Sequence, residues 1–391
     1  MNTITTFDPK NQSRFSFPTL IHFGAGSRKL LASHLTSQGL KKPLIVTDRG
    51  IAGLPFLAEI QTSLRAEGLT PSIFSEIWGN PVKSQVLAGV EAFKNSAADS
   101  IVGLGGGAAL DVAKAIALMI HHPGDLFDYE DDKPGALPVD RDIPYWVAVP
   151  TTAGTGSEVG RSAVVSDDKT HVKKIIFSPR LLAKTVFADP ELTLGLPAQI
   201  TASTGMDALT HCVEAYLAKG FHPMSDGIAL EGIRLAAESL VQAVKEPQNI
   251  SARAKMLMAS MMGAVAFQKG LGVVHSCAHA LSTVADMHHG LANGIMIDHA
   301  LAMNAEAVPG RFEMMARVIG LKDTSPQGFL NWLTQLKKEV GLPANLAAAG
   351  VKLDHLQALC DIAIVDACHP SNPRACTRED FVRIFSKALG V

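Results

Sequence analysis

Residues 100–120, SIVGLGGGAALDVAKAIALMI, combine an apolar run, three glycines and a helical pattern. Ser100 to Leu104 is an apolar run typical of a buried strand, and Ala108 to Ile120 has the spaced apolar residues of a helix. Gly105, Gly106 and Gly107 join the two. Small residues here let a ligand approach the backbone, and unpaired N–H groups at the helix start suit a diphosphate. Because the run is neither GxGxxG nor a Gly-Lys-Ser/Thr loop, a tight turn without a ligand is the alternative.

The alternation of strands and helices continues on both sides of this stretch. Further strands are expected at 43–47, 70–74 and 146–150, with helices at 54–67 and 82–95 and an exposed loop over 121–143. After Asp189-Pro190 helical patterns dominate, at 206–218, 225–245, 252–268 and 274–285 and around 326–340 and 354–367. We therefore predict an α/β domain with a Rossmann-like, mostly parallel sheet over residues 1–189 and an all-helical domain over 190–391.

A second polar turn follows the strand that ends at Pro150. Residues 151–158 read TTAGTGSE, and four hydroxyl side chains there can bind a phosphate or a ribose. Parallel strands end on one edge of a sheet, so this turn and the three glycines can line one crevice. Asp48, at the end of an earlier strand, can accept a hydrogen bond from an adenosine ribose, which favours NAD over NADP. A polar loop and a turn-capping aspartate are the alternatives.

Histidine is concentrated in one short part of the chain. Five of the 14 histidines lie within 25 residues, at positions 275, 279, 288, 289 and 299. Asp207 and His211 are four residues apart in a helical pattern, as are His275 and His279, so each pair shares a helix face. One carboxylate with several imidazoles is a plausible set for Fe²⁺ or Zn²⁺. No HExxH motif occurs, so a zincin hydrolase is not supported.

Composition excludes several classes of protein. The 391 residues are 47% hydrophobic and 18% charged, unlike a disordered chain, and a net charge of −2 without a long basic run argues against nucleic-acid binding. Five cysteines without a CxxC pair fit a reducing compartment. The sequence contains no stretch of 18 apolar residues, so no membrane span is expected. The N-terminal MNTITTFDPKNQSRF lacks the apolar core of a secretion signal. We therefore expect a cytoplasmic protein.

Taken together, the motifs resemble the iron-containing (group III) alcohol dehydrogenase family over nearly the whole chain. Residues 105–114, GGGAALDVAK, resemble the family's GGGSxxDxAK turn, and residues 151–158 match its TTxGTGSE loop. Residues 205–211, GMDALTH, match GxDAxxH; residues 274–281, VHSCAHAL, match the HxxxHxLG region; and His289-Gly290 matches the closing HG. Two departures are Ala108-Ala109 in place of Ser-Pro, which removes one hydroxyl, and His288, an extra histidine beside His289.

The resemblance assigns roles to these positions. It implies four metal ligands: Asp207, His211, His275 and His289. It places His279 near the nicotinamide as a proton relay and implies that Gly105, Gly106 and Gly107 hold the pyrophosphate. The other positions that it implies for the cofactor cleft are Asp48, Asn80, Asp111, Thr151, Thr152 and Lys173.

The same resemblance implies a reaction. It is the reversible, NAD(H)-dependent oxidation of a primary alcohol to an aldehyde, with Fe²⁺ or Zn²⁺ as a Lewis acid, in a homodimer or higher homo-oligomer. Residues 189–233 and 258–279 are similar to 4-hydroxybutyrate dehydrogenases, and a carboxylated substrate needs a cation, for which Arg161, Lys173 and Lys269 are candidates. The alternatives are other short alcohols, glycerol or propanediols, a dehydroquinate-synthase-like lyase on the same fold, and a metal-binding protein without catalysis.

Overall fold

The computed structural model describes residues 15–131 and 133–391. The absence of a secretion signal was predicted from residues 1–15, nearly all of which lie outside the described residues. The chain separates into two compact units. The first, here the sheet unit, comprises residues 18–152 and 156–194; the second, here the helical unit, comprises residues 15–17, 153–155 and 195–391. The predicted domain division between residues 189 and 190 stays a prediction.

The sheet unit is built on a parallel six-stranded sheet with the strand order β1-β8-β5-β4-β2-β3. Its strands are β1 (Leu20–Phe23), β2 (Pro43–Val46), β3 (Ser72–Phe74), β4 (Ser100–Gly105), β5 (Tyr145–Pro150) and β8 (Thr185–Ala188). The central strands β2, β4, β5 and β8 are nearly all buried, as expected for a sheet covered on both faces. The predicted α/β class is confirmed.

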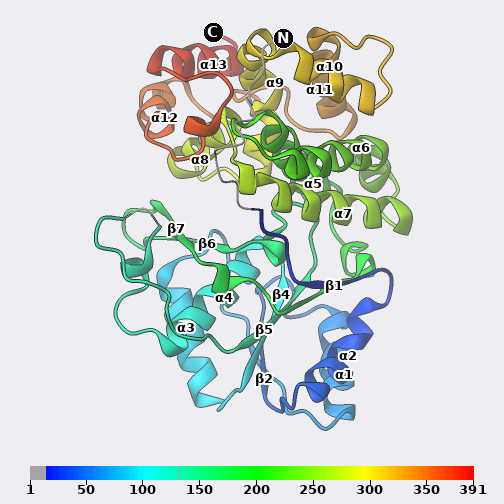
Figure 1. The fold of residues 1–391 in the computed structure, drawn as a ribbon, viewed down its shortest axis with the longest axis vertical. Coiled ribbons are helices and arrows are strands. Elements are labelled where there is room, and N and C mark those ends of the chain that lie inside the picture. Colours follow the sequence, from blue (N-terminus) through cyan, green and yellow to red (C-terminus); the bar gives the residue numbers. More distant parts are fainter. Residues whose placement is uncertain (1–14, 132) are drawn as a thin grey trace. The chain divides into compact units, whose positions relative to one another are not determined.

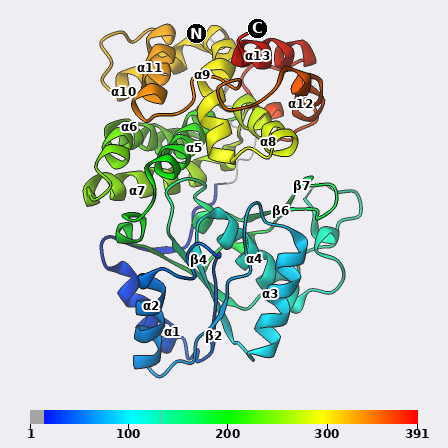
Figure 2. The ribbon, with the colours of Figure 1, turned by 180° about the vertical axis from the view of Figure 1, so that it is seen from behind.

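Helices cover both faces of this sheet. Helices α1 (Leu31–Ser37) and α2 (Pro55–Ala66) lie on one side, and α3 (Lys83–Asn95) and α4 (Gly107–His121) on the other (Figures 1 and 2). Val102 and Leu104 of β4 pack in the core beneath α1 and α2. Gly103, on the opposite face, lies against Leu110 and Ala113 of α4. Because side chains alternate between the two faces of β4, they pack against two different layers of helices.

Two segments beside the sheet differ from the sequence prediction. Strands β6 (Ser162–Ser166) and β7 (Lys173–Phe177) form an antiparallel hairpin that was not predicted. The segment 121–143 is not simply an exposed loop, because Leu126, Phe127 and Tyr129 are buried in a 3₁₀ turn. The backbone N–H of residue 131 donates to the carbonyl of Ile175 at 2.8 Å, so the segment is tied to the hairpin. Its polar composition hid these anchoring side chains.

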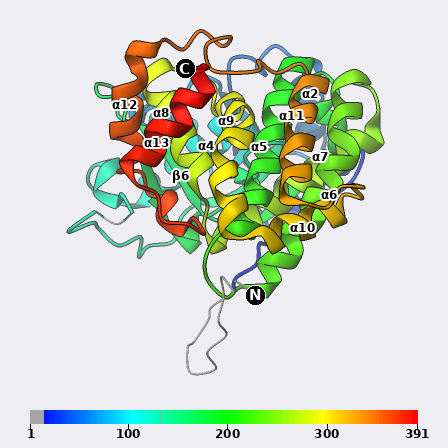
Figure 3. The same ribbon diagram turned by 90° about the horizontal axis from the view of Figure 1, so that it is seen from above.

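The helical unit packs around two buried helices. Its helices are α5 (Ala198–Leu217), α6 (Pro223–Lys245), α7 (Ile250–Ala266), α8 (Val273–Ala285), α9 (His289–Ala307), α10 (Pro309–Val318), α11 (Pro326–Glu339), α12 (Leu356–Ala363) and α13 (Arg378–Leu389). Helix α9 lies among α5, α8, α11 and α13 (Figure 3). Nearly every residue of α5 from Thr201 onward is buried, and the buried residues include the polar Asp207, His211 and Glu214.

The break between α8 and α9 falls where the predicted helix 274–285 ends. His289 is the first residue of α9. Asp286 takes a left-handed conformation, with φ 47°, and ends α8. Asp tolerates this conformation better than most residues, so the chain can turn here without glycine.

Among the described residues, no single helix is long and apolar enough to cross a membrane. One bent pair, Ile250–Lys269 with Val273–Ala285, passes the same test of length and composition, with a bend of 106°. Most residues of these helices are buried against neighbouring helices of the unit.

Candidate metal centre and cofactor-binding loops

Helix α5 presents a carboxylate and an imidazole on one face. Asp207 and His211 are one helical turn apart, and 2% and 5% of their surfaces are exposed. The Nε2 atom of His211 lies 3.9 Å from Oδ1 of Asp207. Burial lowers the pKa of His211 to about 4, so its ring is neutral near pH 7 and can offer a lone pair to a metal.

Helices α8 and α9 bring two more imidazoles to the same carboxylate. His275 is buried in the first turn of α8, and its Nε2 lies 4.0 Å from Oδ1 of Asp207. His289 opens α9, and its Nε2 lies 3.5 Å from the same oxygen. The ring centroid of His275 is 4.7 Å from that of His211 and 5.4 Å from that of His289. Three helices thus converge on Asp207.

This donor set fits a divalent transition metal. The ligand atoms of Asp207, His211, His275 and His289 all lie within 4.8 Å of one another. Two donors on a tetrahedral metal with bonds of about 2.0–2.1 Å stand about 3.3–3.5 Å apart, close to the separations from Asp207. Across residues 15–131 and 133–391, no lysine or arginine forms an ion pair with Asp207. Three imidazoles and a carboxylate suit Fe²⁺ or Zn²⁺. The structure therefore brings the four predicted ligands together, and their binding of a metal stays a prediction.

Gly290 allows α9 to approach α5 this closely. A Cβ atom at Gly290 would lie 2.5 Å from the backbone oxygen of Ser203 and 3.3 Å from Cβ of Asp207. No ordinary Cβ contact is that short with a backbone atom, so a side chain here would push the start of α9 outward. The glycine after His289 therefore keeps that imidazole beside Asp207.

Asn293 is a site residue that the sequence analysis missed. It is fully buried on α9, one turn after His289. Its Nδ2 atom lies 2.7 Å from Oδ1 of Asp207, 3.1 Å from Nε2 of His289 and 3.3 Å from Nε2 of His275. The four-residue spacing from His289 was the available signal. His288, in contrast, caps α9 by accepting a hydrogen bond from the backbone N–H of Leu291.

His279 lies one turn beyond His275 on α8. Its Nδ1 is 2.7 Å from Oδ2 of Asp366, and its ring stacks on His289 with centroids 5.3 Å apart. Ser276 and the backbone N–H of Cys368 donate to the other oxygen of Asp366. Although burial opposes ionisation, His279 and these donors hold the pKa of Asp366 well below its usual range. Asp366 therefore accepts the hydrogen of Nδ1 and leaves Nε2 of His279 to exchange a proton.

The glycine turn of the sheet unit lies at the carboxyl ends of adjacent strands. Gly105 ends β4 with φ 155°, and a Cβ there would lie 2.6 Å from Cβ of Ala109, so only glycine fits. Gly106 precedes α4, which begins at Gly107. The backbone N–H of Thr151, after β5, donates to the carbonyl of Gly105 at 3.0 Å. A Cβ at Gly106 would lie 3.1 Å from Oγ1 of Thr152, so the two turns are in contact.

Asp48 lies beside the same turn. It follows β2, which neighbours β4, and its Oδ2 would be 3.3 Å from a Cβ at Gly105. Its Oδ1 accepts a hydrogen bond from the backbone N–H of Ile51 at 3.1 Å. One carboxylate oxygen therefore caps a local turn while the other faces the glycines, so both readings of Asp48 from the sequence are compatible with its position.

Asp111 connects α4 to its surroundings. Its Oδ1 accepts from Oγ of Ser157 at 2.5 Å, and its Oδ2 accepts from the backbone N–H of Val164 at 3.1 Å. The fully buried Lys114 donates to Oγ of Ser157 and to the carbonyl of Ser162, each at 2.7 Å. This network joins the two family-like motifs, and its carboxylate is already engaged. Direct binding of the cofactor by Asp111 stays a prediction.

Asn80 and Lys173 are both connected to Ser166 of β6, Lys173 by strand pairing and Asn80 through its neighbour Pro81. Lys173, the first residue of β7, pairs with Ser166 of β6. The N–H of Ser166 donates to the carbonyl of Pro81 at 2.7 Å, immediately after Asn80. Both predicted cofactor residues therefore belong to the region of the β6–β7 hairpin.

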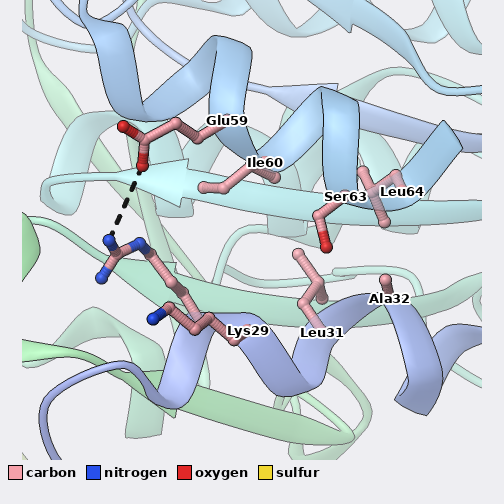
Figure 4. A pocket seen from close by; sticks show the side chains of 8 residues that line it. Lys29, Leu31, Ala32, Glu59, Ile60, Ser63 and Leu64 are labelled. Carbon is pink, nitrogen blue, oxygen red and sulfur yellow. Dashed lines mark ion pairs between the residues drawn. The ribbon is translucent and has the colours of Figure 1, made fainter. Parts of the chain in front are cut away.

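A separate pocket of about 190 Å³ lies between α1 and α2. Figure 4 shows Leu31, Ile60 and Leu64 in its wall and the ion pair between Arg28 and Glu59, whose atoms are 3.7 Å apart. None of the predicted site residues lines it.

Comparisons with known proteins agree on one family. A sequence profile described as "Iron-containing alcohol dehydrogenase" matches residues 18–190, and one described as "Fe-containing alcohol dehydrogenase family, C-terminal" matches residues 201–389. A 4-hydroxybutyrate dehydrogenase of Cupriavidus necator is 36% identical over 95% of this chain and 98% of its own length. An NAD-dependent methanol dehydrogenase of Bacillus methanolicus is 35% identical over 96% of this chain and all of its own length. A crystal structure of a 1,3-propanediol oxidoreductase superposes with a TM-score of 0.91 at 35% identity, covering 96% of this chain and 100% of its own.

Substitution of Gly290 tests the close approach of α9. We expect Gly290→Ala to move the start of α9, to weaken Fe²⁺ binding at least about tenfold, and to lower the free energy of unfolding by about 1–3 kcal/mol. Iron binding is measured anaerobically by competition with a chelator. Gly227→Ala on α6 is the matched control, because a Cβ there meets nothing within 4 Å. It should leave iron binding unchanged and add about 0.5–1 kcal/mol of stability. Unchanged iron affinity in Gly290→Ala would contradict this role.

Glu158 makes the stability of the sheet unit pH-dependent. Its side chain is buried, and burial raises its pKa to about 7 although Lys114 opposes the shift. The folded state therefore binds this proton more tightly than the unfolded state, so stability falls as the pH rises from about 4.5 to 7. Relative to Glu158→Gln, the wild type should lose on the order of 3 kcal/mol of unfolding free energy between pH 5 and pH 8. Denaturant unfolding at both pH values measures this, and a constant difference would refute it.

Proposed function

The chain belongs to the iron-containing alcohol dehydrogenase family, whose members use NAD(H) and iron, and we propose that it reversibly oxidises a short primary alcohol to the aldehyde. The observation that carries the proposal is the convergence of Asp207, His211, His275 and His289 in a chain that matches the family along both of its units. It is an enzyme of the oxidoreductase class.

The helical unit would hold the metal and manage the proton. Asp207, His211, His275 and His289 are the proposed ligands, and Asn293 fixes the carboxylate of Asp207. When bound, iron supplies a Lewis acid for the substrate oxygen and nicotinamide supplies the hydride acceptor. His279, oriented through Nδ1 by Asp366, holds and releases the alcohol proton at Nε2.

The sheet unit would bind the dinucleotide. Gly105, Gly106 and Gly107 place backbone N–H groups at the start of α4, where a pyrophosphate is stabilised. Thr151 and Thr152 add a second turn at the same edge of the sheet. The carboxylate of Asp48, beside Gly105, accepts a hydrogen bond from a ribose hydroxyl. It also repels a 2′-phosphate, so the site favours NAD over NADP. Asn80, Asp111 and Lys173 complete the proposed set.

The proposed substrate is 4-hydroxybutyrate or another short functionalised alcohol. The 4-hydroxybutyrate dehydrogenase of Cupriavidus necator is 36% identical to this chain. Of the cations suggested for a substrate carboxylate, Lys269 is already committed: its buried ammonium binds Asp226 and the carbonyl of Tyr216. Arg161, just before β6, and Lys173 remain as candidates. The structural likeness to a 1,3-propanediol oxidoreductase keeps neutral diols as the second candidate class.

The remaining features of the proposal concern the whole protein. We propose that it acts in the cytoplasm, since all five cysteines are free thiols in the structure and few cysteines fit a reducing compartment. We also propose a homodimer or higher homo-oligomer, and a division into an NAD-binding domain at residues 1–189 and a metal-binding domain at 190–391.

An anaerobic assay with Fe²⁺-loaded protein tests this function. We expect NADH to be consumed in equal amount to the alcohol formed. A four-carbon aldehyde with a terminal carboxylate should have a higher kcat/KM than butanal. Asp207→Ala should lower kcat/KM more than about 100-fold, since loss of groups behind the ligands alone costs about 10–100-fold. Asp354→Ala, at an exposed side chain, is the matched control and should keep full activity.

Three outcomes would count against the proposal. Turnover without any change in NADH would favour a lyase. Full activity of Asp207→Ala would exclude the proposed metal role, and equal kcat/KM for both aldehydes would assign the enzyme to neutral alcohols.

A further inference from the structure

Glu214 is a buried carboxylate that none of the assigned roles uses. It lies on α5, three residues after His211, and only 2% of its surface is exposed. Among the residues that the structure describes, no lysine or arginine forms an ion pair with it. A buried carboxylate without a cation is costly unless its oxygens are fully hydrogen-bonded. Its surroundings must therefore supply several donors.

Those donors come from the first turn of α8. Oε2 of Glu214 accepts from the backbone N–H groups of Gly272 at 3.1 Å and His275 at 3.2 Å, and Oε1 accepts from Val274 at 2.7 Å. The fourth N–H of this turn, on Val273, donates to Oδ1 of Asn372 at 3.3 Å. A helix start leaves four N–H groups without partners inside the helix. Glu214 and Asn372 together satisfy all four, and the positive end of the α8 dipole stabilises the carboxylate.

The same carboxylate also contacts a proposed metal ligand. Nδ1 of His275 lies 2.6 Å from Oε2 of Glu214. Both oxygens of Glu214 face N–H donors, so Nδ1 carries the hydrogen and Nε2 keeps its lone pair. That Nε2 is the atom that points toward Asp207. The contact thus selects the tautomer of His275 that can bind a metal.

We propose that Glu214 is the positioning residue of the metal centre, fixing both the first turn of α8 and the ring of His275; this rests on the proposed function. A single helix, α5, then supplies two ligands and the group that aims a third. A carboxylate behind a ligating histidine fixes its orientation and raises its basicity, and loss of such a partner costs about 10–100-fold in metal affinity.

The competing explanation is that Glu214 only caps α8. Asn372 separates the two explanations, because it caps the neighbouring N–H of the same turn without any hydrogen bond to the ring of His275. If capping alone matters, Asn372→Ala should also weaken metal binding clearly, and Glu214→Gln should weaken it more, because Glu214 accepts from three of the four N–H groups and Asn372 from one. If positioning matters, only Glu214→Gln should weaken it strongly.

The experiment measures Fe²⁺ affinity anaerobically, by chelator competition, for the full-length wild type, Glu214→Gln and Asn372→Ala. We expect a 10–100-fold loss for Glu214→Gln and a change within about twofold for Asn372→Ala. Thermal unfolding of each metal-free variant shows whether it is folded. In case Glu214→Gln does not fold, nitrogen NMR of histidine-labelled, metal-free wild type reads the tautomer directly, with His275→Gln for assignment. We expect His275 to carry its hydrogen on Nδ1.

The outcomes separate this inference from the function on which it rests. A wild type that binds no Fe²⁺ would refute the proposed metal centre and the role of Glu214 with it. Tight wild-type binding with a loss well above twofold in Asn372→Ala as well, or with no loss in Glu214→Gln, would overturn the positioning role alone. A His275 that carries its hydrogen on Nε2 in the metal-free protein would also overturn it.

Discussion

The structure depends on one buried carboxylate that three imidazoles surround. Asp207 is 2% exposed, and the Nε2 atoms of His211, His275 and His289 lie 3.5–4.0 Å from its Oδ1. Burying a carboxylate without a cation is unfavourable. A metal ion bound at this centre would therefore offset the desolvation free energy of Asp207. The burial of α5 on all sides and the missing side chain at Gly290 follow from the need to bring three helices to one point.

Hydrogen-bonded groups behind the ligands determine how rigid this centre is. Asn293 holds the carboxylate of Asp207, Glu214 holds the ring of His275, and Asp366 orients His279 beside them. Asn293 and Glu214 come from α9 and α5, which already contribute ligands, and Asp366 follows α12, which packs against α8. Preorganised ligands lose less entropy when a metal binds, so these contacts contribute to affinity without touching the metal.

The parts of the protein that could be predicted from the sequence are those with a regular spacing of apolar residues or with a known motif. The glycine turn, the buried strands around it and the Asp207–His211 pair all depend on residues close in the chain. Asp366 and Asn372 could not be found in this way, because the residues of α8 that they contact are 90 and 99 residues away in sequence. The β6–β7 hairpin was not predicted because its strands are short and only partly buried, and β7 begins with two lysines. Buried Leu126 and Tyr129 were hidden within a polar, turn-rich segment.

The most direct test is to locate the metal in a crystal of the iron-loaded protein by anomalous diffraction. We expect one strong peak within about 2.0–2.2 Å of an oxygen of Asp207 and of Nε2 of His211, His275 and His289. A second group of candidate ligands, His279, Asp366 and Cys368, offers an alternative position on the same unit. Iron at that second group, or none at Asp207, would contradict a metal centre built on Asp207.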